Sequence, residues 1–301
     1  MNDILKITAS LTGICVAAAL ILGGVFAKTD AARKDIERQE KDHTIQNLLG
    51  FGHGHTPPAD LKVHQVHRYV IDQPDGTKVL GYVLPTKEGT YVLATIDLMG
   101  KPQKVVPLQA DAAKMLEEGS RTQAVVAALP GSRATYAETF FVANKGSERL
   151  AYVLPGVTQG FKTYIQLMVS VDPALTVTGV AVIKSEEDPG LGDEIKKDFF
   201  KNQFKGKTKD ALKELKVIKE PLPEEYRDAL EPDRIKKKNL SGEKVTEIKS
   251  KHIKDDIYAL TGATISSRAL TRGVVETVTK FAYRLAILDK AIKQDNIPVS
   301  F

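Results

Sequence analysis

An uncharged stretch near the N-terminus constrains this chain more than any other feature. Residues 7–26 (ITASLTGICVAAALILGGVF) form a run of 20 residues without a charged side chain. As an α-helix that rises ~1.5 Å per residue, the run reaches roughly 30 Å, the thickness of the hydrocarbon core of a bilayer. We therefore predict a single transmembrane helix and assign residues 1–27 as a membrane anchor.

A cleaved signal peptide is the alternative interpretation of this stretch. Val25-Phe26-Ala27 has the small-x-small spacing of a signal-peptidase site, but the apolar run is longer than a usual signal core. More basic residues follow the run than precede it, which by the positive-inside rule would keep the next domain in the cytoplasm. Long domains are nevertheless translocated despite such flanking charges, so the side stays open on this criterion.

The composition of the chain narrows its chemistry. Of the 301 residues, 42% are hydrophobic and 27% charged, which excludes disorder throughout. The single cysteine, Cys15, excludes an internal disulfide, a thiolate zinc site and an iron–sulfur cluster, so redox chemistry would need an organic cofactor or a non-thiolate metal. The net charge of +5 is too diffuse to indicate nucleic acid as a partner.

Hydrophobic patterns predict a polar helix and then two groups of strands. Residues 28–49 are typical of a polar helix, which the Gly- and Pro-rich segment FGHGHTPP ends. The predicted strands are 63–71, 78–85 and 90–97 in the first group, and 139–144, 148–155, 162–172 and 176–183 in the second, with a mainly helical segment at 108–130 between them. The hexamers LGYVLP (80–85) and LAYVLP (150–155) nearly repeat at a spacing of 70 residues, which indicates either a duplicated strand unit or chance.

The last third of the chain contrasts a charged region with a regular helix. Residues 193–256 mix charges of both signs with weak helical periodicity, which predicts a solvated, partly helical insertion; a partner-binding lysine patch at Lys236–Lys238 is the alternative. Residues 266–294 carry apolar side chains at helical spacing, from Leu270 to Leu285, and predict one long helix.

Two histidine pairs form a candidate metal site. His53 and His55 lie in the Gly-rich segment, and His64 and His67 lie on a predicted strand. On a strand, residues three apart point to opposite faces, so the pattern favours surface histidines and we predict no metal.

Two short segments contain motifs that could bind a cofactor. In residues 260–267 (LTGATISS), small residues and hydroxyls lead into the long predicted helix, whose N-terminal N–H groups and dipole suit a phosphate; ordinary capping by Thr264 or Ser266 is the alternative. Residues 186–193 (EEDPGLGD) follow a predicted buried strand and form a tight turn with available backbone N–H groups; a plain acidic surface turn is the alternative.

Together, these motifs resemble the FMN-binding domain shared by the G subunit of the Rnf electron-transport complex and the C subunit of the sodium-pumping NADH:quinone reductase. The resemblance covers about residues 125–290, and the phrases QFKGK (203–207) and ATISSRAL (263–270) look more like the Rnf subunit. The family's acidic-Thr-Pro-Gly-Leu-Gly turn corresponds to residues 187–192, and its Ser/Thr-Gly-Ala-Thr flavinylation motif to residues 261–264.

The resemblance implies a covalent flavin carrier. It implies that Thr264 carries FMN through a phosphoester bond, attached by a flavin transferase, and that the flavin lies toward the 187–192 turn. The cofactor-binding residues that it implies are Thr264, Thr261, Gly262, Ala263, Ser266, Ser267, Glu187, Pro189, Gly190, Leu191 and Gly192. It implies no residue that catalyses a reaction alone, because the redox chemistry belongs to the cofactor.

The chain departs from the family pattern at two positions. Tyr258 stands where the flavinylation motif usually has Asp, with Asp255 and Asp256 nearby but out of register. Asp188 replaces the usual Thr of the turn and adds negative charge beside the flavin. If the attaching enzyme requires the missing Asp, Thr264 would stay unmodified or be modified slowly.

We therefore expect an α+β protein with one transmembrane helix, an antiparallel-sheet FMN-binding domain, a candidate duplicated strand unit and a long C-terminal helix. The expected segments are an anchor (1–27), a polar helical linker (28–49), an accessory unit (50–124) and the FMN-binding domain (125–301). The resemblance implies electron transfer within a membrane-bound, ion-translocating redox complex, with the soluble domain on the outer side of the cytoplasmic membrane. The alternatives are a scaffold subunit that has lost flavinylation, and another membrane-tethered flavoprotein that uses the same domain.

Overall fold

The N-terminal part of the chain is a single long helix. The computed structural model describes residues 2–52 and 55–301, and the chain divides into two units, 1–54 and 55–301. Helix α1 (Asn2–Leu48) has 47 residues, roughly 70 Å of α-helix. It is long and apolar enough to cross a membrane. The predicted anchor and the predicted polar linker helix are therefore one continuous helix, which ends at Leu48 just before Gly50.

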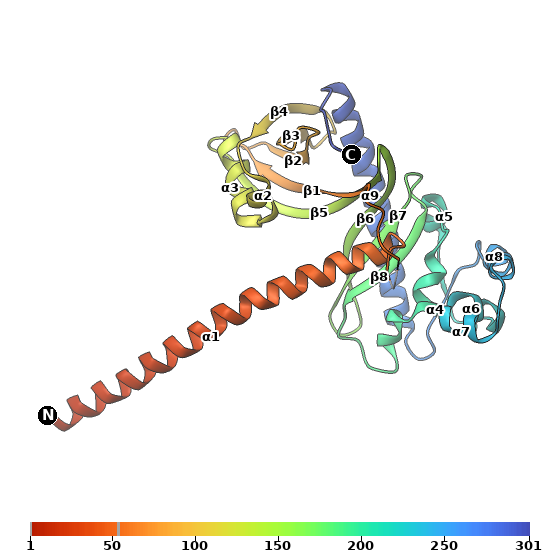
Figure 1. Ribbon diagram of the computed structural model, residues 1–301, viewed down its shortest axis with the longest axis horizontal. Coiled ribbons are helices and arrows are strands. Elements are labelled where there is room, and N and C mark those ends of the chain that lie inside the picture. Colours follow the sequence, from red (N-terminus) through yellow and green to blue (C-terminus); the bar gives the residue numbers. More distant parts are fainter. Residues whose placement is uncertain (1, 53–54) are drawn as a thin grey trace. The chain divides into compact units, whose positions relative to one another are not determined.

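The second unit is built on one antiparallel sheet of eight strands (Figure 1). The strands are β1 (Leu61–Asp72), β2 (Lys78–Pro85), β3 (Tyr91–Asp97), β4 (Pro102–Leu108), β5 (Arg133–Lys145), β6 (Glu148–Gln159), β7 (Tyr164–Val171) and β8 (Val177–Lys184), in the order β4-β3-β2-β1-β5-β6-β7-β8. Seven of them match the predicted strands. The sequence patterns missed β4, because Pro102 and Pro107 interrupt its hydrophobic pattern and its side chains are mostly exposed.

The strand order supports a duplication. Each half is a four-stranded meander, β1–β4 and β5–β8, and the halves join through the antiparallel pair β1·β5. The hexamers at 80–85 and 150–155 lie on the second strand of each half, β2 and β6. Lys78 and Glu148, the first residues of these strands, are 70 residues apart, the same spacing as the hexamers.

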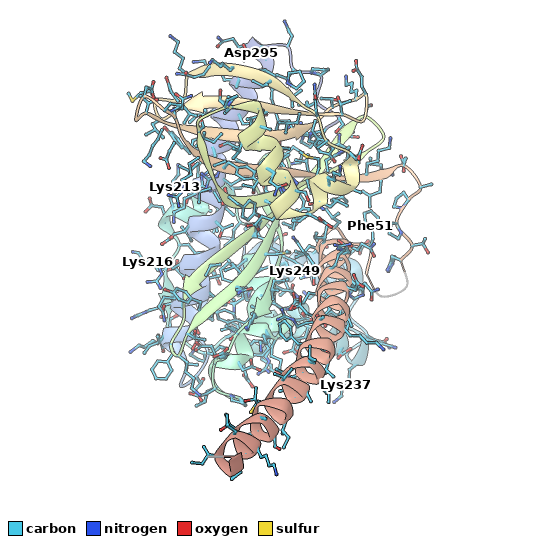
Figure 2. All side chains as sticks on the ribbon, turned by 90° about the vertical axis from the view of Figure 1, so that its left-hand side faces the viewer. Phe51, Lys213, Lys216, Lys237, Lys249 and Asp295 are labelled. Atoms are coloured by element: carbon cyan, nitrogen blue, oxygen red, sulfur yellow. The ribbon has the colours of Figure 1, made fainter. Side chains whose placement is uncertain are left out.

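Helices bury both faces of the first half of the sheet. On β2, Tyr82 and Leu84 join a core that contains α9 (Thr264–Gln294), whereas Val79 and Val83 join a core on the other face. This second core is closed by α2 (Ala112–Leu116) and α3 (Glu118–Ala128). Helix α9 runs along the sheet, with Asp295 just past its C-terminal end (Figure 2). Near that end, Arg284 pairs with Glu138 at 2.5 Å, and Arg68 pairs with the same carboxylate at 2.8 Å. The long helix is thereby fixed to the β1·β5 seam.

The charged region between β8 and α9 is more ordered than the expected solvated insertion. It contains η1 (Gly192–Lys196), α4 (Asp198–Lys201), η2 (Asn202–Phe204), α5 (Lys209–Glu214), β9 (Val217–Ile218), α6 (Glu224–Leu230), α7 (Pro232–Lys237), α8 (Gly242–Lys251) and β10 (Ile257–Tyr258). Tyr226, Leu230 and Ile248 form a small apolar cluster of their own. Because each helix has at most ten residues, no long helical periodicity accumulates in the sequence.

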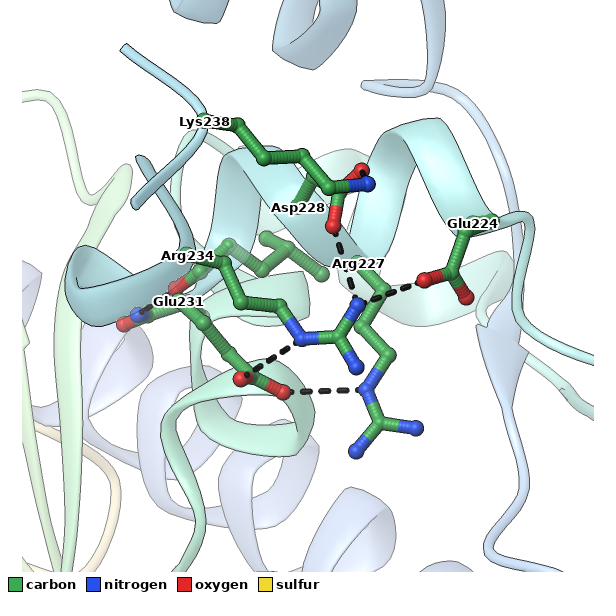
Figure 3. Close-up of polar contacts among 8 residues, drawn as sticks. Glu224, Arg227, Asp228, Glu231, Arg234 and Lys238 are labelled. Carbon is green, nitrogen blue, oxygen red and sulfur yellow. Dashed lines mark hydrogen bonds and ion pairs between the residues drawn. The ribbon is translucent and has the colours of Figure 1, made fainter. Parts of the chain in front are cut away.

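Ion pairs hold two of these short helices together (Figure 3). The carboxylate of Asp228 is buried and pairs with Arg234 at 2.9 Å and with Lys238. Arg227 pairs with Glu231 at 3.0 Å. Lys238, a member of the alternative lysine patch, thus has an intramolecular partner.

The described histidines make contacts within the protein. On β1, His64 lies opposite Val142 and its Nδ1 is 2.9 Å from the Ser300 hydroxyl. His67 is buried, and its Nδ1 is 2.6 Å from Thr139 Oγ1. His53 lies outside the described residues, and within the described ranges no group of three metal-ligating side chains lies close enough to hold a metal ion.

Candidate functional site

Helix α9 begins without a side-chain cap. Its N-cap residue is Ala263, and no side chain in the described ranges accepts a hydrogen bond from the N–H groups of the first turn. The N–H groups of Ala263 and Ser267 bond to backbone carbonyls, whereas those of Thr264, Ile265 and Ser266 have no acceptor in the described part of the chain. The alternative of ordinary capping by Thr264 or Ser266 is therefore wrong. Three free donors and the positive end of a 31-residue helix suit an anion.

The hydroxyl groups of this first turn differ in their engagement. The Ser267 hydroxyl is buried, donates to the Ala263 carbonyl at 2.9 Å and accepts from the Leu260 N–H. The Ser266 hydroxyl is buried and donates to Glu187. The hydroxyl of Thr264, which is half-buried, makes no hydrogen bond to any described residue. Of the three, Thr264 is the hydroxyl that is available for chemistry.

The Pro-Gly turn lies against this helix start, as the resemblance implies. The turn closes through a 3.1 Å bond from the Leu191 N–H to the Asp188 carbonyl, and Pro189 and Gly190 are exposed at its tip. A Cβ on Gly262 would lie 3.2 Å from Leu191 Cδ2, so the turn contacts the 261–264 segment directly. The left-handed backbone of Gly262 (φ 76°) permits this approach.

Large apolar side chains are exposed on the segments that meet at the helix start. We call Phe161, Leu191 and Ile265 the apolar rim; they are 57%, 48% and 57% exposed. They belong to the β6–β7 turn, the Pro-Gly turn and the first turn of α9, respectively. Exposed apolar side chains grouped around polar donors mark ligand sites. Sequence reasoning missed Phe161 and Ile265, although Gly160-Phe161 directly follows a strand and Ile265 directly follows Thr264.

Hydrogen bonds and an ion pair connect the segments that form the site. The carboxylate of Glu187 joins the β6–β7 turn to α9, and the Arg272 guanidinium donates to the Gln159 carbonyl at 2.9 Å. Lys162 pairs with Asp188 across the two turns, and the hydrogen bond to this carboxylate raises the pKa of Lys162. The residue that departs from the usual Thr is thus part of an ion pair.

Tyr258 is not free to face a ligand. It is 9% exposed, pairs with Ile218 across β9 and β10, and packs edge-on to Tyr226. Its hydroxyl donates to Asp255 at 2.8 Å, and burial together with this bond raises its pKa to about 12. Burial disfavours the Asp255 carboxylate, but hydrogen bonds from His252 and Tyr258 hold the pKa of Asp255 below its usual range. The structure therefore places a carboxylate at the tip of the Tyr258 side chain.

These groups fit a flavin mononucleotide. Thr264 provides a free hydroxyl, the first turn of α9 provides donors for phosphate oxygens, and the apolar rim provides surface for an aromatic ring. Of the residues implied by the resemblance, Thr261 and Gly262 are exposed beside this surface and Ala263 is the N-cap. Ser267 faces the protein interior, and the side chain of Glu187 is engaged by protein groups.

Comparison with known proteins also supports FMN as the ligand of this site. Residues 160–279 match the family model of the FMN-binding domain. The G subunit of the proton-translocating ferredoxin:NAD(+) oxidoreductase complex of Clostridium ljungdahlii is 34% identical over 145 residues, 47% of this chain and 60% of that protein. The G subunit of the Na(+)-translocating complex of Acetobacterium woodii is 28% identical over 135 residues, 44% of this chain and 50% of that protein. The matched segments span about half to three fifths of the length of these relatives.

A solved structure is also similar in part. The crystal structure of Shewanella oneidensis NqrC superposes with a TM-score of 0.45 at 17% identity, and the alignment covers 84% of this chain and 99% of that one. The sequence matches confirm the resemblance to the G subunits that the two motifs indicate, and they support FMN as the cofactor.

Proposed function

We propose that this chain is the membrane-anchored electron-transfer subunit of an ion-translocating ferredoxin:NAD(+) oxidoreductase complex, and that it carries FMN in a phosphoester linkage to Thr264. The relatives that it resembles are G subunits of such complexes. The observation that carries the proposal is the start of α9, where the Thr264 hydroxyl and three adjoining N–H groups have no hydrogen-bond partner among the described residues. Other membrane subunits of the complex and a flavin transferase are the partners that this function requires.

Each part of the site has a role in this proposal. The Thr264 oxygen forms the ester, and the N–H groups of Ile265 and Ser266 hold phosphate oxygens with the support of the helix dipole. The apolar rim packs against the isoalloxazine ring and excludes water from one side of it. FMN, when bound, supplies reversible electron transfer, and the protein orients it and tunes its potential.

The intact mass of the protein purified from its native membrane tests the linkage. Formation of the ester removes the hydroxyl hydrogen of Thr264 and one hydroxyl of the phosphate, so the mass rises by one FMN less one water. We expect this gain in the native protein and in Thr246→Ala, and no gain in Thr264→Ala. Both substitutions remove one threonine hydroxyl, but the exposed Thr246 on α8 lies outside the motif, so the pair separates attachment from general damage. An unmodified native protein would contradict the covalent linkage and favour a scaffold role; the co-purifying subunits then identify the complex.

We also propose that the soluble unit lies on the outer side of the cytoplasmic membrane. The uncharged run in α1 anchors it, and translocation of a long domain overrides the flanking basic residues. A cysteine at Met99, which is 90% exposed, in a Cys15→Ser background provides the test. We expect a membrane-impermeant maleimide to label this cysteine in intact cells. Labelling only after the cells are lysed would place the unit inside.

A further inference from the structure

Glu187 lies where three segments of the candidate site meet. One carboxylate oxygen, Oε1, accepts hydrogen bonds from the backbone N–H groups of Phe161 at 2.8 Å and Lys162 at 3.3 Å. The other, Oε2, accepts from the Ser266 hydroxyl in the first turn of α9. Glu187 itself belongs to the loop that leads into the Pro-Gly turn. One side chain therefore joins the β6–β7 turn, the Pro-Gly turn and the start of the long helix.

The surroundings of this carboxylate leave it no access to a ligand. Glu187 is 5% exposed. A Cβ on Gly160 would lie 2.4 Å from Oε1, and a Cβ on Gly192 would lie 2.7 Å from Oε2 and 2.6 Å from Ser266 Oγ. Because Gly160 and Gly192 have no Cβ, the backbone at both positions packs directly against the carboxylate. A buried carboxylate is stable only when hydrogen bonds satisfy it, and two backbone N–H groups and one hydroxyl provide such bonds here.

From these contacts we infer that Glu187 is a positioning residue, which acts through Ser266 and Phe161 rather than by touching the flavin. The bond to Ser266 fixes the first turn of α9, which carries Thr264 and the free N–H groups. It also engages the Ser266 hydroxyl, as the Ala263 carbonyl engages that of Ser267, and Thr264 is then the first-turn hydroxyl with no partner among the described residues. The bonds to the β6–β7 turn fix Phe161, a member of the apolar rim. This inference rests on the proposed attachment of FMN at Thr264.

We call the Glu187 carboxylate and its three hydrogen bonds the clamp. Hydrogen exchange on protein without flavin tests whether the clamp holds the three segments together. In a Thr264→Ala background, we expect Glu187→Ala to raise amide exchange about tenfold at Phe161 and Lys162, whose N–H groups lose their acceptor. We expect a similar rise at Ser267, whose N–H bonds to the Ala263 carbonyl in the helix turn that the Ser266 bond no longer fixes. Glu187→Gln, which keeps the shape and the acceptor oxygen, should stay near the parent protein. Glu186→Gln is the matched control, since Glu186 is the adjacent exposed acid. Unchanged exchange in either segment of Glu187→Ala would overturn the clamp.

Attachment of FMN tests the consequence of the clamp. With Thr264 present and the flavin transferase co-expressed, we expect Glu187→Ala to slow FMN incorporation about tenfold, Glu187→Gln to restore most of the rate, and Glu186→Gln to leave it unchanged. Ser266→Ala should also slow incorporation, and the double variant Glu187→Ala/Ser266→Ala should lose less than the product of the two single losses. Equal losses in the Gln and Ala variants, or multiplicative losses in the double variant, would overturn a role through Ser266.

The two experiments separate the possible failures. If Glu187→Ala does not fold, as judged by its thermal unfolding, then Glu187→Gln and Ser266→Ala still test the exchange and the incorporation. If the parent protein takes up no FMN on Thr264, the proposed function fails, and the exchange data still decide whether Glu187 holds the three segments together.

Discussion

The two halves of the sheet share one strand arrangement but differ in the segments that come after the fourth strand. In the first half, β1–β4 lead into α2 and α3, which close a core on one face of the sheet. In the second half, β5–β8 lead into the 185–192 loop, the insertion and then α9 on the opposite face. The free helix start, the Pro-Gly turn and the buried Glu187 occur in the second half. The second meander therefore supplies the scaffold and the β6–β7 turn with Phe161, and the segments after it supply the rest of the site.

The two halves also differ in the buried side chain that holds a following helix against the sheet. In the first half, the buried Arg121 side chain ties α3 to β1 and to the end of α2. In the second half, the buried Glu187 carboxylate ties α9 to the β6–β7 turn. One anchor secures a structural helix and the other a helix that presents a hydroxyl group. Substitutions in each half should therefore separate stability from cofactor attachment.

The largest effect on stability is expected from the first-half anchor. Arg121 is 3% exposed and donates to the Tyr69 hydroxyl at 3.0 Å and to the Met115 carbonyl at 2.7 Å. Arg121→Ala should lower the free energy of unfolding by about 3 kcal/mol, because buried polar groups lose partners and the packed stem is lost. Urea unfolding followed by tyrosine fluorescence measures this, with the exposed Arg133→Ala as control. The folded fraction should keep its FMN; a selective loss of FMN would contradict the division of roles.

A methyl group beside Glu187 should affect both stability and attachment. In Gly160→Ala, the new Cβ would lie 2.4 Å from Glu187 Oε1 and 2.8 Å from the Thr163 carbonyl oxygen, so the turn must shift. We expect a loss of about 2 kcal/mol in stability and a lower FMN content per folded protein, measured by urea unfolding and by intact mass. Gly242→Ala, at a helical position with open space, is the control. A fully flavinylated Gly160→Ala protein would argue against the clamped geometry.

The ion pairs of the insertion should make its stability depend on pH. Burial disfavours the charged form of Asp228, but hydrogen bonds from Lys238 and Arg234 hold its pKa below the usual range. A depressed pKa contributes stability above the unfolded-state value of about 3.9, and this stability is lost as the pH falls through the folded-state pKa.

Asp228→Asn tests this contribution. At pH 7 we expect it to lower the free energy of unfolding by about 2 kcal/mol, because Arg234 and Lys238 lose a buried partner. Below about pH 4 the difference from the parent protein should shrink, because the parent carboxyl also becomes protonated. Urea unfolding at several pH values measures both effects, with the exposed Asp233→Asn as control. A difference that is independent of pH would show that packing, rather than charge, is lost.

The smallest effect on stability is expected at the hexamers, where the two halves are most alike. Gly81→Ala converts the first hexamer into the second, LAYVLP. The new Cβ would lie 2.5 Å from Ile71 Cδ1 and 3.1 Å from Leu93 Cδ1, the ends of flexible side chains that can move. We expect a loss of about 1 kcal/mol or less in thermal or urea unfolding and no change in FMN content. The reciprocal Ala151→Gly is the control in the second half. A lower FMN content per folded protein would mean that the first half also shapes the site.

Much of the fold could be predicted from local patterns. Alternating apolar residues predicted seven of the eight strands, and apolar residues at helical spacing predicted α9 from residue 266, two residues after its observed start at Thr264. Strand β4 was missed because prolines and exposed side chains remove the alternation. The order of the insertion was missed because charged residues such as Asp228 and Arg234 stabilise it through specific partners, which charge patterning does not identify.

For the site, the two motifs, the threonine at position 264 and the uncharged run of α1 could be read from the sequence, because each depends on residues that are adjacent in the chain. The tertiary structure decided that Ala263 leaves the helix start uncapped, that Phe161 and Ile265 are exposed beside it, and that Glu187 bonds to Ser266, 79 residues away. It also decided that both strand groups form one sheet. Hydrogen bonds and burial between distant residues depend on how the chain folds back on itself, and no local pattern contains that information.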